Sequence, residues 1–198
     1  MGHGAEKNDD VLYRQFLQGD TASYDELMIR YGDRLTFYLH GYLHDMNDAE
    51  DLMIDAFARI MVKRPLIRNG AFKAYLFKTA RNLALRHQER KRRLDTFSID
   101  GLDTELADIV LAGSGAAESP VEDEVRLEAR KQILHQCLGR IEPELKEALW
   151  LIYFEDMSYA QAASVMGVKE KRIDRLLVRG KQHMRRELEK EGVTNAYE

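Results

Sequence analysis

Several residue types and patterns are scarce in this sequence, and each absence excludes a class of structure or chemistry. The chain has one cysteine, Cys137, which rules out an intramolecular disulfide and fits a reducing, cytoplasmic environment. The apolar residues around Cys137 predict a buried thiol rather than a nucleophile. No apolar run approaches the roughly 18 residues of a membrane span, so no membrane insertion is expected. The N-terminal residues lack the apolar core of a signal peptide.

Metal-binding and catalytic patterns are missing as well. The six histidines never form a pair such as HExxH. His135 and Cys137 lie two residues apart, which places them on different faces of a helix. There is no Ser-His-Asp set and no glycine-rich phosphate loop. We therefore expect no metal, no cofactor and no enzymatic activity.

Strand-like alternation of apolar and polar residues is absent, and only three prolines interrupt the chain. Apolar residues recur at helical spacing instead, which predicts an all-α fold. The 198 residues are enough for one or two domains. Gly32 is expected to end or bend a helix. Helix caps are expected at Asp9 or Asp10, at Asp20, and at Asn47 or Asp48.

The formal charge of −4 is unevenly distributed along the chain. Residues 81–93 contain six basic residues and one acid, and residues 161–186 contain eight basic residues and two acids. Residues 94–125 between them contain nine acids and no lysine or arginine. Two basic segments that flank an acidic connector indicate a protein whose surface meets a polyanion.

The acidic connector also marks the domain organisation. Its GSGAA run and the following Pro120 predict a flexible linker over residues 95–119. Helical domains are therefore expected over residues 9–94 and 120–190. A long helix should open the second domain after Pro120, because its acids lie early and its basic residues later, as the helix dipole favours. Trp150 is expected to anchor the small core of this domain.

Residues 142–188 predict a helix-turn-helix. Ser158 can cap a helix, and Gly167 can end it in a left-handed conformation. After a short turn, a basic helix keeps Ile173, Leu176 and Leu177 for a core. In this motif the second helix enters the DNA major groove. A basic amphipathic helix alone would equally fit a solvated surface, but the ordered set of serine cap, Ala-Ala pair, glycine stop and clustered basic residues favours DNA binding.

The segment DAEDLMIDAFARI carries a cluster of acids. Asp48, Glu50, Asp51 and Asp55 could be imagined as a carboxylate metal site, but no further ligands lie nearby in the sequence. A well-capped helix with an acidic exposed face is the simpler interpretation. The basic loop KRPLIRNG and a long helix with a basic end follow, and together they predict a nucleic-acid surface.

Two stretches resemble the same protein family. The segments YGDRLTFYL, DAEDLMIDAFARI and FKAYLFKTARNLALRHQERKRR, in this order, are similar to the first domain of alternative sigma factors of the extracytoplasmic-function (ECF) type. The segment PELKEALWLIYFEDMSYAQAASVMGVKEKRI resembles the C-terminal helix-turn-helix domain of that family. The likeness covers nearly all of residues 9–93 and 120–190. It implies a subunit that binds bacterial core RNA polymerase and directs it to promoters by reading the −10 and −35 elements.

The resemblance also implies a role for each surface. The acidic helix should dock on the clamp coiled coil of the largest polymerase subunit, through Asp48, Glu50, Asp51 and Asp55. The basic loop and the following helix should open and read the −10 element as a single strand. The candidates there are Lys63, Arg64, Arg68, Lys78, Arg81, Asn82 and Arg86.

The helix from about residue 171 should read the −35 element. Arg172 and Arg175 are the candidate base contacts, because arginine can pair bidentately with guanine. The candidate phosphate contacts, which position the helix without specifying sequence, are Lys171, Arg179, Lys181 and Arg185. Further partners implied by the resemblance are the polymerase flap region and an anti-sigma protein, and the acidic linker should run toward the RNA-exit region.

The sequence departs from the family pattern at four positions. Ile54 stands where a polar residue is common, and Lys169 replaces the usual serine or threonine cap of the recognition helix. Asp174 and Leu176 stand where basic residues are common. These departures predict an unusual promoter preference and a modest affinity for the −35 element.

A stand-alone helix-turn-helix regulator is the alternative function. Its first domain would dimerise or sense a ligand, and the DAEDL helix would have no necessary role. Such a regulator usually dimerises to match a palindromic site. No heptad seam for a dimer is evident in the sequence.

Overall fold

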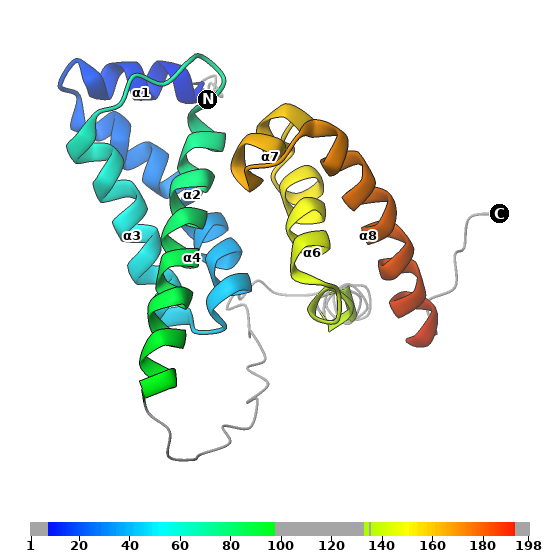
Figure 1. The fold of residues 1–198 in the computed structure, drawn as a ribbon. Coiled ribbons are helices and arrows are strands. Elements are labelled where there is room, and N and C mark those ends of the chain that lie inside the picture. Colours follow the sequence, from blue (N-terminus) through cyan, green and yellow to red (C-terminus); the bar gives the residue numbers. More distant parts are fainter. Residues whose placement is uncertain (1–7, 98–132, 135, 193–198) are drawn as a thin grey trace, which may run out of the picture.

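The structure is a computed structural model that describes residues 8–97, 133–134 and 136–192, and within these ranges every regular element is a helix. The elements are α1 (Asp9–Leu17), α2 (Thr21–Leu43), α3 (Met46–Lys63), α4 (Phe72–Phe97), α6 (Pro143–Leu149), the π-helix η1 (Trp150–Phe154), α7 (Tyr159–Met166) and α8 (Glu170–Lys190). Figure 1 shows α1–α4 as a first bundle and α6–α8 as a second bundle. The all-α prediction is confirmed for the described ranges.

The segment between the bundles falls mostly outside the described ranges. Residues 95–97, where the linker was expected to begin, continue α4. The remainder of the expected linker and most of the helix expected after Pro120 are not described. Residues 133–134 and 136–139, at the end of that helix, are helical. Cys137 among them is buried, as predicted.

An aromatic cluster forms the core of the first bundle. Phe16 of α1 stacks on Tyr24 of α2 with ring centroids 4.4 Å apart, and Tyr24 meets Phe57 of α3 edge-on at 5.8 Å. The buried Tyr24 hydroxyl donates to the Phe57 carbonyl at 2.6 Å, so its polar atom is satisfied inside the core. Tyr13 packs on Phe72 at the start of α4. Burying each ring contributes roughly 1.5–3 kcal/mol, and together these contacts fix α1, α3 and α4 on α2.

Two of the predicted helix caps are wrong. Asn8, rather than Asp9 or Asp10, caps α1 and accepts from the Asp10 N–H at 3.1 Å. Asp45, rather than Asn47 or Asp48, caps α3 and accepts from the Asp48 N–H at 3.0 Å. In both places several Asn and Asp residues adjoin, and the cap is the one whose backbone is extended before the helix begins. The prediction of Asp20 as the cap of α2 is confirmed.

Gly32 does not end a helix, which was one of the two predicted outcomes, because α2 runs unbroken from Thr21 to Leu43. The flanking Tyr31 and Leu35 are buried in the core. Their packing holds the helix together across a residue that would weaken an isolated helix by about 1 kcal/mol.

The second bundle contains the predicted helix-turn-helix. The Ser158 hydroxyl accepts from the Gln161 N–H, and the Gln161 side chain accepts in return from the Ser158 N–H, which is a complete capping box. Gly167 ends α7 with φ 69°. α8 packs closely on α6 at Gly180, where a Cβ would lie only 3.1 Å from the Leu149 side chain. Trp150 is partly buried, and its ring stacks on Phe154 at 4.7 Å.

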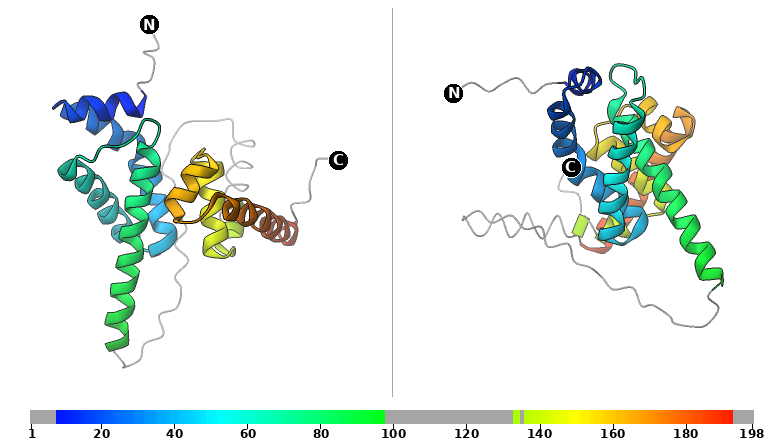
Figure 2. Two further views of the ribbon diagram at one scale, coloured as in Figure 1. Left: turned by 45° about the horizontal axis from the view of Figure 1, so that its top comes forward. Right: turned by 90° about the vertical axis from the view of Figure 1, so that its left-hand side faces the viewer.

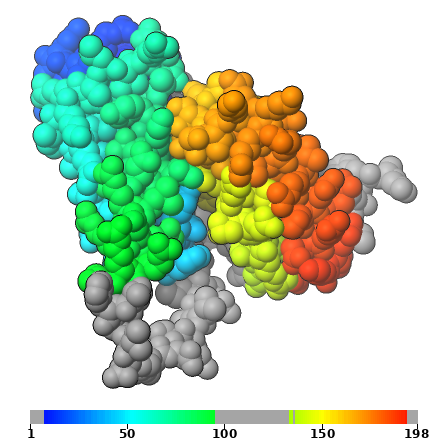
Figure 3. Space-filling model, in the orientation of Figure 1, coloured from blue at the N-terminus to red at the C-terminus, as the bar shows by residue number. Residues whose placement is uncertain are grey.

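The two bundles pack against each other through α4 and α7. Both views in Figure 2 place α7 beside the upper part of α4. In the space-filling view of Figure 3 the surface of α7 adjoins that of the first bundle. Surfaces of both bundles are therefore partly covered by this docking.

Candidate nucleic-acid interface

The acidic residues of α3 lie mostly on the side of the helix that faces away from the core. Glu50, Asp51 and Asp55 are exposed, and the side chain of Ile54 between them is 53% exposed. Asp51 and Asp55 lie four residues apart, as do Glu50 and Ile54, so the four side chains form two adjacent rows that make one surface. This surface is acidic with an apolar centre.

Asp48 lies at the edge of that surface, three residues before Asp51. It is half-buried, and its carboxylate lies 3.2 Å from Nε2 of His87 on α4. The structure therefore exposes three of the four predicted polymerase-binding acids and pairs the fourth with α4.

The loop between α3 and α4, residues 64–71, carries basic and apolar side chains into solvent. Lys63, the last residue of α3, and Arg68 are exposed. Arg64 is also exposed, has φ 44°, and places its guanidinium 5.0 Å from the centre of the Phe16 ring. Leu66 is 96% exposed at the loop tip.

One face of α4 continues this basic surface. Lys78, Asn82 and Arg86 are exposed and follow one another at intervals of four residues, which places them on a single stripe of the helix. Arg81 is half-buried and lies off this stripe. It faces the second bundle instead.

Arg81 is bound to a carboxylate of the second bundle. Its Nε donates to Oε1 of Glu147 on α6 at 2.8 Å, and the Tyr38 hydroxyl donates to the same oxygen at 2.8 Å. Glu147 is only 7% exposed. Burial acts to lower the pKa of Arg81, but the Glu147 carboxylate outweighs it and the pKa lies above its ordinary value. Arg81 is thus a charged group that is already paired.

A second buried carboxylate lies in the same interface. Glu155 is 1% exposed, and its Oε2 lies 2.9 Å from Nη2 of Arg34 on α2. Lys73 of α4 donates to the Glu155 backbone carbonyl at 2.6 Å. Burial raises the pKa of the Glu155 carboxyl, and the charges of Arg34 and Lys73 oppose that shift. The side chain of Gln161 also crosses the interface and donates to the Gly70 carbonyl at 2.8 Å.

The predicted −35 residues fall into two groups on α8. Arg172 forms a bidentate pair with Glu144 of α6, with Nε and Nη2 both at 2.9 Å. Arg179 pairs with Glu142 at 3.3 Å. Arg175 is exposed and donates to the carbonyl of Lys171 on its own helix at 3.3 Å. Lys171, Arg172, Arg175 and Arg179 form one group, with Glu144 of α6 and Glu142, the residue before α6, beside them.

Lys181 and Arg185 form the other group, farther along α8. They border a groove of about 650 Å³ whose walls are mainly apolar. The Lys181 ammonium lies 5.2 Å from the centre of the Tyr153 ring. Among the four positions that depart from the family pattern, Leu176 is buried, which explains why this position carries no basic side chain. Lys169 precedes α8 and makes no side-chain cap bond.

Sequence reasoning missed several residues that shape these surfaces. Glu147 and Glu155 look like ordinary helix acids, and nothing in the sequence signals their partners. Leu66 was detectable as an apolar residue within a basic loop, and Gln161 as the fourth residue of a capping box. Asp10 was mistaken for a cap, although its carboxylate accepts from the Gly70 N–H.

Two helical bundles, a helix-turn-helix and separate basic surfaces define a DNA-binding transcription protein, and comparison with known proteins makes the class specific. Residues 27–94 match the family described as Sigma-70 region 2, and residues 131–184 match Sigma-70, region 4. The RNA polymerase sigma-H factor of Pseudomonas aeruginosa is 27% identical over 166 residues, which cover 81% of this chain and 83% of that one. The ECF RNA polymerase sigma factor SigM of Bacillus subtilis is 25% identical over 164 residues, covering 81% and 92%. The chain therefore belongs to the sigma-70 family, within its ECF group, and it is a sigma factor that directs promoter-specific transcription.

Solved structures share the fold. CnrH in complex with the cytosolic domain of CnrY has a TM-score of 0.61 at 19% identity, covering 91% of this chain and 97% of that one. The sigma factor RpoE in complex with the anti-sigma factor NepR from Bartonella quintana has a TM-score of 0.63 at 23% identity, covering 84% and 96%.

Within the described ranges, no helix is long and apolar enough to cross a membrane. The same residues contain no cluster of three or more His, Cys, Asp or Glu side chains that could hold a metal ion. Sigma factors are non-catalytic subunits, so family membership agrees with the expectation that the chain is not an enzyme.

Proposed function

We propose that this sigma factor divides promoter recognition between its two bundles. Residues 9–94 would bind polymerase and read the −10 element, residues 95–119 would connect the bundles, and residues 120–190 would read the −35 element. The observation that carries this division is that each bundle presents its own exposed basic face, one on the loop and α4, the other on α8. The factor would act in the cytoplasm, where its polymerase partner works.

The acidic surface of α3 is the proposed contact with the clamp coiled coil of polymerase. Glu50, Asp51 and Asp55 would meet basic residues there, and Ile54 would add an apolar contact at the centre. Asp48 would serve mainly to join α3 to α4 through His87.

The loop and the exposed stripe of α4 form the proposed −10 surface. Lys63, Arg64, Arg68, Lys78, Asn82 and Arg86 would follow the backbone and bases of the separated strand. Leu66 is placed to pack against a splayed base, because an exposed apolar side chain can insert between unstacked bases. Arg81 would join this surface only after Glu147 has moved away from Arg81.

On the second bundle we propose Arg175 as the leading base contact, since Arg172 is held by Glu144. Lys171 and Arg179 would contact phosphates around it. Lys181 and Arg185 lie at the apolar groove and would contribute charge at the edge of the DNA surface. The polymerase flap region remains a proposed partner of this bundle.

An anti-sigma protein is a further proposed partner, and it would act on the docked arrangement of the bundles. Both solved structures named above are sigma factors in complexes, one with an anti-sigma factor and one with the cytosolic domain of CnrY. We propose that an anti-sigma protein also binds this chain and favours the docked arrangement, in which Arg81 is unavailable to DNA.

Binding of the purified chain to bacterial core RNA polymerase, followed by run-off transcription on a pool of genomic fragments, tests the proposal. The wild type should bind and give promoter-selective transcripts. The double variant Asp51→Lys/Asp55→Lys should bind polymerase at least about tenfold more weakly, since two favourable charges become repulsive. A matched control, Asp25→Lys/Asp33→Lys, changes exposed acids of α2 and should bind as the wild type does.

Two outcomes would contradict the proposal. Equal binding by Asp51→Lys/Asp55→Lys and the wild type would place the clamp contact elsewhere. Retention of a specific duplex by the chain alone, without any binding to polymerase, would favour the stand-alone regulator.

A further inference from the structure

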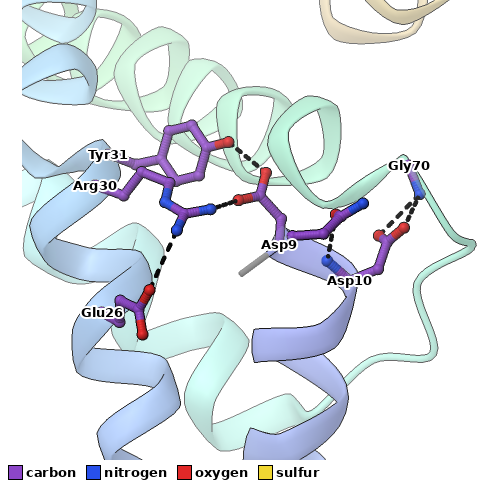
Figure 4. Close-up of polar contacts among 7 residues, drawn as sticks. Asp9, Asp10, Glu26, Arg30, Tyr31 and Gly70 are labelled. Carbon is purple, nitrogen blue, oxygen red and sulfur yellow. Dashed lines mark hydrogen bonds and ion pairs between the residues drawn. The ribbon is translucent and has the colours of Figure 1, made fainter. Parts of the chain in front are cut away.

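Residues 64–71 form the loop that is proposed to read the −10 element, named the −10 loop below. Helix α1 holds this loop at both ends of the loop. At the first end, the Tyr13 hydroxyl of α1 donates to the Pro65 carbonyl at 2.7 Å. At the far end, both carboxylate oxygens of Asp10 accept from the Gly70 N–H, at 2.8 and 2.7 Å. Figure 4 shows Asp10 reaching from the start of α1 to Gly70. Between these two anchors Leu66 and Arg68 are exposed.

Asp10 contacts the loop where its backbone turns. Gly70 has φ 73°, a left-handed conformation that L side chains rarely adopt. Within the loop, the Ala71 N–H donates to the Arg68 carbonyl at 3.0 Å. Two side chains contact Gly70 from outside the loop: Gln161 of α7 donates to its carbonyl, and Asp10 of α1 accepts from its N–H. The Asp10 contact belongs to the first bundle itself, so it can fix the direction in which the loop enters α4 when the bundles separate.

Helix α1 is itself held in place by contacts with α2, so Asp10 has a fixed position from which to hold the loop. Asp9, the neighbour of Asp10, accepts from Nη1 of Arg30 on α2 at 2.6 Å and also from the Tyr31 hydroxyl. Arg30 in turn contacts Glu26 at 3.2 Å, as Figure 4 shows. One carboxylate thus joins α1 to α2, and the next joins the loop to α1.

From these contacts we infer that Asp10 is a positioning residue for promoter opening: it orders the loop that presents Leu66 and Arg68 to the separated strand. The inference rests on the proposed −10 role of the loop. A loop anchored at one end only must be ordered when the strand binds, and that loss of entropy weakens binding.

A purely electrostatic role for Asp10 predicts the opposite effect on DNA binding when Asp10 is removed. Asp10 lies near the basic residues of the loop, so its charge alone would repel DNA phosphates. Removing it should then strengthen DNA binding. A positioning role predicts weaker opening instead, and it predicts that asparagine, whose side-chain oxygen still accepts from an N–H, restores function.

The test compares Asp10→Ala, Asp10→Asn and the charge-matched control Asp33→Ala, all in the full chain with core polymerase. Promoter opening is followed by 2-aminopurine fluorescence in the −10 element. We expect opening by Asp10→Ala to fall about fivefold, with polymerase affinity unchanged. Asp10→Asn should recover to within about twofold of the wild type, and Asp33→Ala should not differ from it.

A second measurement does not depend on polymerase. The NMR signal of the Gly70 amide should shift, and its hydrogen exchange should accelerate, in Asp10→Ala but not in Asp33→Ala. An unchanged Gly70 amide, or stronger opening by Asp10→Ala, would overturn the inference. Failure of the wild type to bind polymerase would refute the proposed function instead, and the Gly70 amide would still decide whether Asp10 holds the loop.

Discussion

Arg81 of α4 donates to Glu147 of α6 at 2.8 Å, so a candidate DNA contact of the first bundle is neutralised by a carboxylate of the second. The Tyr38 hydroxyl, buried in the first bundle, donates to the same carboxylate oxygen. Docking of the bundles therefore occupies the charge of Arg81, so a DNA contact by Arg81 would compete with docking.

Replacing Glu147 with glutamine should shift the chain toward separated bundles. The amide keeps the size of the side chain but cannot neutralise Arg81, and the loss of a charge-assisted hydrogen bond costs about 1.5–3 kcal/mol. Energy transfer between dyes at Ile29→Cys and Val178→Cys, two exposed positions, measures the separation. The efficiency should fall in Glu147→Gln and stay constant in the control Asp25→Asn. Equal efficiencies in all three proteins would show that this pair does not hold the bundles together.

Mild acid should also weaken docking, through His40 on α2. Burial, followed by the charges of His44 and of Lys146 on α6, lowers the pKa of His40 below its ordinary value of 6.5, against an opposing effect of Asp45. The part of this shift that comes from Lys146 disappears when the bundles separate, and to that extent the separated state binds more protons than the docked state. The contribution of His40 to docking is full above about pH 6.5 and is lost as the pH falls through the lowered pKa.

The same energy-transfer pair, followed from pH 8 to pH 5, checks this expectation. Transfer should decline on the acid side in the wild type, and the decline should be smaller in His40→Gln. Glu155 acts in the opposite sense, because burial raises the pKa of its carboxyl, but it is present in both proteins. A decline of the same size in both would exclude His40 as the group responsible.

Removing Glu144 should strengthen binding to the −35 element. Glu144 holds Arg172 in an exposed bidentate pair, and exposed pairs are weak, so freeing Arg172 should change DNA affinity by roughly fivefold or less. Glu144→Ala should raise duplex affinity by up to this factor at low salt. Arg175→Ala should relax sequence preference more than Arg172→Ala does. Fluorescence anisotropy with wild-type and scrambled −35 duplexes, in the polymerase complex, distinguishes these effects; a larger loss for Arg172→Ala would reverse the proposed order.

Gly32 offers a test of stability in the middle of α2. A Cβ at this position would meet no heavy atom within 4 Å, and its backbone is not left-handed. Gly32→Ala should therefore stabilise the protein by about 0.5–1 kcal/mol, because it reduces the freedom of the unfolded chain. Gly180→Val should destabilise it by about 1–3 kcal/mol, since α6 lies against that position. Thermal unfolding measures both changes, and a destabilised Gly32→Ala would mean that α2 is strained there.

Much of the architecture follows from local patterns. Helical periodicity predicted the helices, and the capping box at Ser158 with the stop at Gly167 predicted the helix-turn-helix, because caps and stops are decided within a few residues. Gly32 was misinterpreted because the packing of Tyr31 and Leu35, which is not a local property, overrides the weakness of glycine. The caps of α1 and α3 were misplaced because neighbouring Asn and Asp residues offer equivalent side chains.

The interface between the bundles was beyond local reasoning. Arg81 and Glu147 are 66 residues apart in the chain, and Arg34 and Glu155 are 121 apart. Neither carboxylate differs in sequence from an acid on a solvated helix face. Their burial depends on how the two bundles meet, which periodicity and charge counting do not encode. For the same reason, the sequence predicted Arg81 as a DNA contact but gave no sign of Glu147, the carboxylate that competes with DNA for it.

The two buried carboxylates also determine how charge is partitioned when the bundles part. Arg34, Lys73 and Arg81 stay with the first bundle, whereas Glu147 and Glu155 leave with the second. Separation thus frees three cations of the first bundle, two of them on α4, the helix that follows the loop proposed to read single-stranded DNA. A polyanion that reaches these cations stabilises the parted chain, so promoter DNA would itself act as the ligand that keeps the sigma factor open.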